Sequence, residues 1–304
     1  MRRGIVLGVL IALGTLAAVK AQPPQQEVPK TLTVDKLKDN LYVLKAVPGP
    51  TPAGGGNTAV FITATGVVVV DTKNPGWGKP TLDKIKELTP KPITMIINTH
   101  THGDHVSGNV EFPATVDVVA QDNTKANMEK MDIFKEHNNV GMAKRTFKDT
   151  MTLGKGADQI DLYYFGPGHT NGDAIVVFPA LRTAHIGDLF ARKGMPLVDG
   201  TNGGSVLHYP ETVNKVYSGI KNVDVVITGH SDTTMTWQDV KEYANFTQDF
   251  LTWAQGELKA GKTPEQAAAE WKLPDKYKGY SAEVSTLMGG LPGRLQRLQE
   301  ELKK

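Results

Sequence analysis

The chain reads Thr99-His100-Thr101-His102-Gly103-Asp104-His105 directly after a short apolar run, residues 92–98. That run begins with proline, contains β-branched residues and is too short for a helix, so it predicts a buried strand with the histidines at its end. Three imidazoles and a carboxylate so close together are costly to bury as packing groups. Neutral imidazole and carboxylate are usual zinc ligands, and the stretch therefore predicts a metal site at a sheet edge.

The same arrangement recurs three times along the chain. Predicted strands over residues 158–165, 183–186 and 224–228 lead into His169, Asp188 and His230. Within the first stretch, alternate side chains can point to one locus while the last two turn toward a second. The seven donors are enough for two sites of three ligands and one bridging carboxylate. Asp71 ends a further predicted strand, where it could orient a ligating histidine.

The order of these motifs, His-x-His-x-Asp-His, Gly-His-Thr, Gly-Asp and Gly-His, is similar to that of the metallo-β-lactamase superfamily. The resemblance covers about residues 31–260. It implies an α/β (α+β) fold, the αβ/βα metallo-β-lactamase sandwich, with two packed mixed sheets and helices outside. It also implies a first metal on His100, His102 and His169, a second on Asp104, His105 and His230, and Asp188 bridging both.

The resemblance implies two zinc ions, with iron or manganese also acceptable to such ligands, and a metal-bound hydroxide that attacks a carbonyl carbon. Asp104 would take or pass a proton. The segment Gly166–Thr170 looks most like the β-lactamase branch, whereas an aspartate at 188 is similar to glyoxalase II-type thioesterases and lactonases. We expect a small-molecule carbonyl substrate and rank a β-lactam narrowly before a lactone, ester or thioester. The alternative is an iron-dependent redox enzyme or a non-catalytic metal-binding protein on the same scaffold.

The N-terminus predicts export. Met1-Arg2-Arg3 precedes the apolar run Gly4–Val19, and small residues follow, which indicates a signal peptide over residues 1–21. The run is shorter than the ~20 residues of a membrane span, so we expect no stable membrane anchor after cleavage and a periplasmic or secreted protein. A polar, proline-rich leader, residues 22–30, comes next.

Composition limits the chemistry. The 304 residues are 39% hydrophobic, which suffices for a large core. There is no cysteine, so disulfides and thiolate ligands are excluded. The net charge is +2 and would become −1 after removal of three basic signal residues. That near-neutral charge gives no electrostatic reason to expect nucleic acid as a partner and counts against a nuclease.

We predict a catalytic domain over residues 31–260 and a C-terminal helical appendage over 261–304, and the oligomeric state stays open. Helical patterns cover residues 79–88, 123–134 and 236–259. Thr263, Pro264 and Gln266 indicate a capped helix start in the appendage. A glycine/proline loop, Pro48–Gly56, is expected at the rim of the site.

Several residues outside the ligand set are candidates for substrate contact. Asn109 could help hold an oxyanion, although a local turn or capping role explains it as well. Arg192 and Lys193, in the loop after Asp188, could bind a substrate carboxylate. His208, in the polar loop 199–210, could touch substrate.

Overall fold

The structure is a computed structural model that describes residues 30–47 and 54–304. The predicted signal peptide, nearly all of the leader and most of the 48–56 loop lie outside the described residues. Among the described residues, no helix has both the length and the apolarity needed to cross a membrane.

The first sheet has seven strands in chain order. The first four pair antiparallel as a meander, and the last four pair parallel. Its strands are β1 (Leu32–Lys38), β2 (Leu41–Ala46), β3 (Thr58–Ile62), β4 (Val67–Val70), β5 (Ile93–Ile97), β6 (Asp117–Gln121) and β7 (Arg145–Phe147). Parallel neighbours such as β4 and β5 end at the same edge of the sheet, which is where the histidine-rich stretch begins.

The second sheet has six strands in the order β13-β12-β11-β10-β9-β8. All neighbours pair antiparallel except β11 and β12. Its strands are β8 (Thr150–Leu153), β9 (Ile160–Tyr163), β10 (Ile175–Phe178), β11 (Thr183–His185), β12 (Val225–Ile227) and β13 (Met235–Thr236).

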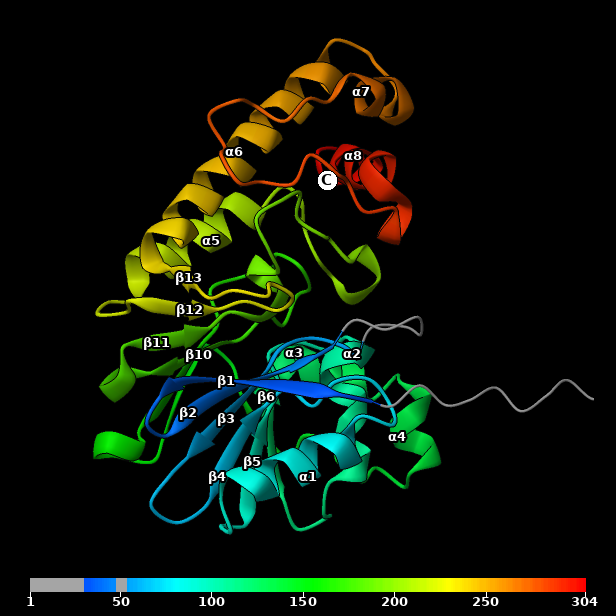
Figure 1. Cartoon of the computed structure of the whole chain (residues 1–304). Coiled ribbons are helices and arrows are strands. Elements are labelled where there is room, and N and C mark those ends of the chain that lie inside the picture. Colours follow the sequence, from blue (N-terminus) through cyan, green and yellow to red (C-terminus); the bar gives the residue numbers. More distant parts are fainter. Residues whose placement is uncertain (1–29, 48–53) are drawn as a thin grey trace, which may run out of the picture.

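The two sheets pack face to face with helices on both outer sides (Figure 1). Successive side chains along a strand enter different cores, which shows how the layers are arranged. In β10, Val176 and Phe178 enter the core between the sheets, whereas Ile175 and Val177 enter the core beneath the outer helices. The fold is thus the predicted αβ/βα sandwich. The four residues of β10 form a continuous apolar run because both faces of this strand are covered.

The helices divide between the two outer faces. The first sheet is associated with α1 (Gly78–Leu88), α2 (Gly103–Val106), α3 (Asp122–Met128) and α4 (Asp132–Glu136). The second is associated with α5 (Tyr209–Gly219), α6 (Trp237–Lys259), α7 (Pro264–Glu270) and α8 (Gly290–Glu301). Short 3-10 helices cover Ser107–Glu111, Gly156–Asp158, Pro179–Leu181, Gly187–Phe190, Gly200–Asn202 and Leu287–Gly289.

The prediction of one helix over residues 123–134 is wrong, because the chain breaks between α3 and α4. Met128 and Phe134 are both fully buried in the same core. Six residues along a helix correspond to a rotation of about 240°, so one continuous helix would point the two side chains in different directions. The break lets both side chains reach that core.

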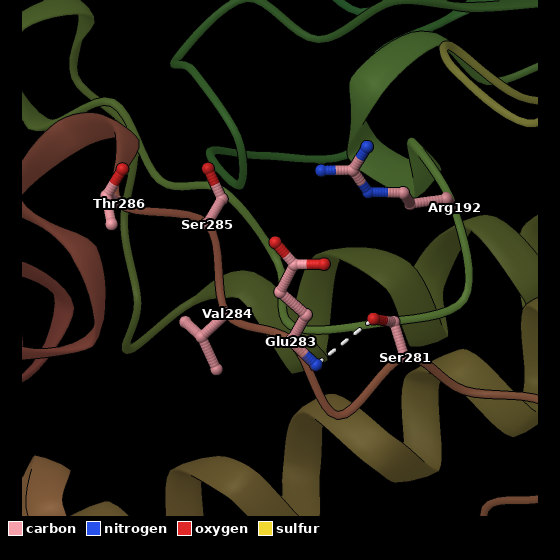
Figure 2. A pocket seen from close by; sticks show the side chains of 6 residues that line it. All are labelled: Arg192, Ser281, Glu283, Val284, Ser285 and Thr286. Carbon is pink, nitrogen blue, oxygen red and sulfur yellow. Dashed lines mark hydrogen bonds between the residues drawn. The ribbon is translucent and has the colours of Figure 1, made fainter.

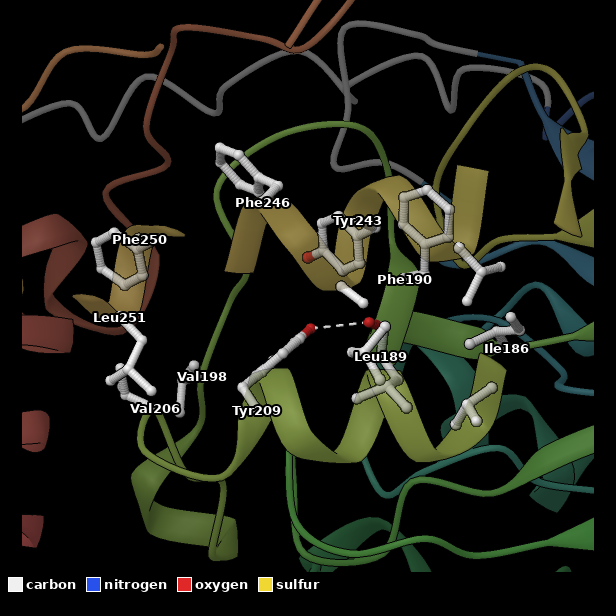
Figure 3. Close-up of a cluster of buried hydrophobic side chains, with 14 of the residues drawn as sticks. Ile186, Leu189, Phe190, Val198, Val206, Tyr209, Tyr243, Phe246, Phe250 and Leu251 are labelled. Carbon is white, nitrogen blue, oxygen red and sulfur yellow. Dashed lines mark hydrogen bonds between the residues drawn. The ribbon is translucent and has the colours of Figure 1, made fainter. Parts of the chain in front are cut away.

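The C-terminal residues share a core with the helices of the second sheet. Leu291, Leu295 and Leu298 of α8 belong to the same apolar cluster as Tyr243 and Phe246 of α6. Figure 3 shows the α6 side of this cluster, with Val198 and Val206 from the intervening loop packed into it. The predicted capping box at the start of α7, Thr263 with Gln266, is present.

Candidate metal centre

The predicted ligands all come from segments that follow strand ends. His100 and His102 lie just beyond β5, Asp188 follows β11, and His230 follows β12. His169 lies in the loop between β9 and β10. α2 is a single turn that begins after His102 and carries Asp104 and His105 on from that strand end. Both sheets therefore contribute side chains to one locus.

The ligand atoms form two groups. One consists of His100, His102, His169 and Asp188, the other of Asp104, His105 and His230, and within each group the atoms lie within 4.8 Å of one another. In the first group, His102 Nδ1 lies 2.9 Å from His169 Nε2. In the second, His230 Nε2 lies 3.3 Å from His105 Nε2 and 3.3 Å from Asp104 Oδ2.

Asp188 lies between the two groups. Its Oδ2 is 3.6 Å from His169 Nε2 and 3.2 Å from His230 Nε2, and its Oδ1 is 3.4 Å from His105 Nε2. Its side chain is 4% exposed, and a Cβ added at Gly229 would lie 1.8 Å from Oδ1. Glycine is therefore required at 229, and the carboxylate is in position to serve both groups.

The donor set fits metal ions. Among the described residues, His100 Nε2 and Asp188 Oδ1 are buried side-chain atoms without a hydrogen-bond partner. A buried polar atom without a partner costs free energy, and coordination to a cation would satisfy both lone pairs. Imidazole nitrogens with carboxylate oxygens suit zinc, and also iron or manganese.

The other ring nitrogen of four ligands is held by a hydrogen bond. His100 Nδ1 lies 2.9 Å from the Thr99 hydroxyl. His105 Nδ1 lies 2.7 Å from Asp71 Oδ2, His102 Nε2 lies 2.8 Å from Asp199 Oδ2, and His169 Nδ1 lies 2.9 Å from the Leu197 carbonyl oxygen. Such bonds fix the tautomer and orientation of a ligating imidazole. The orienting role of Asp71 is as expected, whereas Asp199 and Leu197 were not predicted.

Asp71 holds its position at a backbone cost. Its φ is 62°, in the left-handed region that few residues other than glycine adopt. Its carboxylate accepts hydrogen bonds from the Thr99 backbone N–H at 2.8 Å and the Thr99 hydroxyl at 2.7 Å, besides meeting His105. These bonds link the end of β4 to the start of the histidine-rich stretch.

The electrostatics of the two groups differ. Burial, together with neighbouring histidines, lowers the pKa of His100 and brings that of His169 to about 4, so both rings are neutral donors at pH 7. In the second group burial would lower the pKa of His230, but Asp188 and Asp104 outweigh it and raise that pKa to about 9. Here protons and metal ions compete for the same lone pairs.

Gly56 lies directly against the second group. A Cβ added there would be 2.1 Å from His105 Cε1, and its N–H donates to the Asp104 carbonyl oxygen at 2.9 Å. Gly54 and Gly56 are both buried. This end of the predicted rim loop therefore packs beneath a ligand instead of standing at the rim.

The structure does not support substrate contact by Asn109, which is 1% exposed. Its Oδ1 accepts from the Thr72 hydroxyl at 2.7 Å, and its Nδ2 donates to Asn98 Oδ1 at 2.8 Å and to the Gly141 carbonyl oxygen at 2.9 Å. The amide is thus used within the core, in bonds that join segments 11 to 37 residues apart, so the alternative of a local turn or capping role is not what the structure shows either.

Of the predicted basic candidates, Arg192 faces open space. It lines a pocket of about 380 Å³ with Ser281, Glu283, Val284, Ser285 and Thr286 (Figure 2). Lys193 instead forms a 2.6 Å ion pair with Asp239 in the capping box of α6. His208 is exposed, with Nδ1 2.9 Å from the Ser205 hydroxyl, and no interaction joins it to the ligand groups.

The comparisons with known proteins agree with this geometry. The family model of the metallo-beta-lactamase superfamily matches residues 51–242. The metallo-beta-lactamase type 2 of Elizabethkingia meningoseptica is 29% identical over 244 residues, covering 77% of this chain and 90% of that protein. A hydroxyacylglutathione hydrolase of Crocosphaera subtropica is 32% identical over 122 residues, 38% of this chain and 41% of its own.

Solved structures share the fold. A metallo-beta-lactamase from Pontibacter korlensis superposes with a TM-score of 0.58 at 20% identity, over 72% of this chain and 99% of its own. A double mutant of a sec-alkyl sulfatase superposes with a TM-score of 0.69 at 16% identity, over 89% of this chain and 50% of its own.

Proposed function

The chain belongs to the metallo-beta-lactamase superfamily, and from that membership we propose that it is an exported hydrolase that uses two metal ions to cleave a small carbonyl compound. The position of Asp188 carries the proposal. One carboxylate lies within 3.6 Å of ring nitrogens from both groups, so the two sets of three ligands share a seventh donor. Two adjacent cations would supply Lewis acidity, which activates water and polarises a carbonyl oxygen.

The side chains divide the work. His100, His102 and His169 would hold one ion and Asp104, His105 and His230 the other, with Asp188 common to both. Asp104 is 31% exposed where Asp188 is 4% exposed, so Asp104 is the carboxylate that substrate and solvent can reach. Burial would raise the pKa of Asp104, but His105 and His230 lower it to about 2, so the carboxylate is ionised at neutral pH and available as a metal ligand. The expected role of Asp104 in taking or passing a proton stays part of the proposal.

We rank a β-lactam narrowly before a lactone, ester or thioester. The first relative named above is a metallo-beta-lactamase, which supports the β-lactam, and the hydroxyacylglutathione hydrolase supports the thioester over a shorter alignment. An anionic group on the substrate stays a prediction from the place of Arg192 in the loop after Asp188, because the pocket that Arg192 lines also contains Glu283 and is lined by none of the candidate metal ligands. Export rests on the N-terminal sequence, and an intact-mass measurement on the protein from the native periplasm or medium would show cleavage after Ala21.

The test is turnover by purified protein loaded separately with zinc, manganese and iron, on one β-lactam, one acyl lactone, one aryl ester and one thioester. Zinc-dependent cleavage of any member supports the hydrolase and ranks its substrates. Silence across the panel with two metals bound would contradict the proposal and favour the redox or non-catalytic alternative.

The variant Asp188→Ala tests the role of the carboxylate that the two groups share. Because this side chain serves both groups, we expect the variant to lose metal content and turnover together. Its affinity for metal should fall by about 10-fold or more. A variant that keeps two metals and full turnover would exclude the bridging role.

A further inference from the structure

Three polar side chains of α8 contact the loop that precedes α5. Arg294 Nε donates to the Pro196 carbonyl oxygen at 2.5 Å, and Arg297 Nη2 donates to the Gly204 carbonyl oxygen at 3.1 Å. Glu301 Oε2 accepts from the Leu207 backbone N–H at 2.9 Å. The last helix therefore contacts both ends of residues 196–207, which we call the clamp loop.

The other side of the clamp loop contacts the first metal group. The Leu197 carbonyl oxygen holds His169, and the Asp199 carboxylate holds His102. The Asp199 backbone N–H also donates to the His169 carbonyl oxygen at 2.8 Å. Gly204 lies so close that an added Cβ would be 2.3 Å from that same oxygen. A shift of the clamp loop would therefore move both rings.

Arg294 is an unusual residue for the interior of this helix. It is 1% exposed, and none of the ion pairs among the described residues includes it. Its Nη1 makes a long 3.4 Å bond to the Ser285 carbonyl oxygen, and its Nη2 is buried without a partner. Burying a guanidinium without a carboxylate costs stability, so a leucine or methionine would serve a purely structural helix better.

The helix that carries Arg294 and Arg297 lies in the part of the chain outside the family match. The superfamily model ends at residue 242, and α8 begins at Gly290. The clamp loop itself lies inside the match, so a helix from beyond the matched region supports residues of the metal centre.

We propose that α8 is a positioning element for the first metal group, with Arg294 and Arg297 as positioning residues that fix His102 and His169 through the clamp loop. This inference rests on the proposed function, since it concerns how the metal ligands are held. The second group is not held in this way, because His105 is oriented by Asp71 from the first sheet.

Arg294→Met tests the proposal by separating stability from metal binding. Removal of the unpaired buried charge should leave the Tm unchanged or higher. Loss of the bond to Pro196 should weaken the first site, and we expect about 10-fold lower affinity in a chelator competition with Co²⁺. The cobalt-shifted ring N–H signals of His102 and His169 should move in the NMR spectrum while that of His105 stays. Arg294→Lys, which keeps one donor, should recover part of the affinity.

Leu298→Ala is the matched control, because Leu298 is fully buried in α8 but makes none of the polar contacts to the clamp loop. It should lower the Tm without moving the His102 and His169 signals. If Arg294→Met fails to fold, Arg297→Met carries the same expectation through Gly204. If a folded Arg294→Met or Arg297→Met protein binds two metals and the ring signals of His102 and His169 are unchanged, the inference about α8 is wrong while the proposed function still stands. A wild-type protein that binds no metal would overturn the proposed function.

Discussion

At the scale of single residues, Lys73 is the least expected group near the site. It has no exposed surface, and its Nζ donates to the Gly56 carbonyl oxygen at 2.6 Å and the Leu44 carbonyl oxygen at 3.0 Å. Burial lowers its pKa from 10.5 to about 7, although Asp71 and Asp104 oppose the shift. The amine is thus partly neutral at physiological pH.

This pKa predicts a pH-dependent stability. Between about pH 7 and 10 the unfolded chain binds a proton at Lys73 that the folded chain does not, so the contribution of Lys73 to the free energy of unfolding rises with pH, by at most ~1.4 kcal/mol per unit. His230, with its pKa raised to about 9, contributes a slope of the opposite sign between about pH 6.5 and 9. Lys73→Met lacks this contribution. Urea unfolding at pH 7, 8 and 9 should therefore give a slope of the free energy of unfolding against pH that is more positive for the wild type than for the variant, whatever the offset between them. Parallel pH profiles would show that Lys73 does not titrate in this range.

Single residues also show how far the sequence leads. The seven candidate ligands could be predicted because each is a metal-binding residue type beyond an apolar or alternating segment that predicts a strand. Asp199 could not, because it lies 97 residues from His102 and nothing in its own segment marks the contact. Leu197 contributes a backbone carbonyl, which any residue type carries, so its side chain holds no signal.

At the scale of elements, the segment that carries Gly56 must pass close to a ligand. Gly56→Ala would place a methyl group 2.1 Å from His105 Cε1 and 2.6 Å from Nε2. Both residues are buried, so the ring must shift, and we expect the second metal to be lost from the purified protein. Metal analysis tests this.

Gly256→Ala in α6 is the comparison. An added Cβ meets nothing within 4 Å there, and the helix interior favours alanine by about 1 kcal/mol. This variant should be more stable and keep its metals. Equal metal content in the two variants would contradict the role assigned to Gly56.

Elements differed in how well the sequence predicted them. The strands that lead to the candidate ligands are apolar or, in β9, alternate polar and apolar residues, and they were predicted, whereas the short strands β7 and β8 carry few buried residues and were not. α5 was also missed, although Pro210 in its first turn and buried residues at Tyr209, Val213 and Val216 follow helical spacing. The polar residues before α5 led us to extend the predicted loop to residue 210, although the helix begins at Tyr209.

At the scale of the whole molecule, the candidate metal centre joins the two halves of the sandwich. His100, His102, Asp104 and His105 follow a strand of the first sheet, whereas His169, Asp188 and His230 come from loops of the second. Bound metal should therefore stabilise the folded chain as a whole. At a free metal concentration a thousandfold above Kd the gain is about 4 kcal/mol, which corresponds to a Tm shift on the order of 10 °C.

Chelation tests this stabilisation. Removal of metal should lower the Tm, and added metal should restore it in a concentration-dependent way. A protein whose Tm is the same with and without chelator would show that the two halves do not depend on the metal centre.

The most direct test of the central claim is a titration of metal-free protein with zinc, or with whichever metal supports turnover, while hydrolysis of the best substrate is followed. Two sets of ligands that share Asp188 predict that turnover rises until two equivalents per chain are bound and then stays constant. Full turnover at one equivalent, or in excess chelator, would contradict a centre that works with two metal ions.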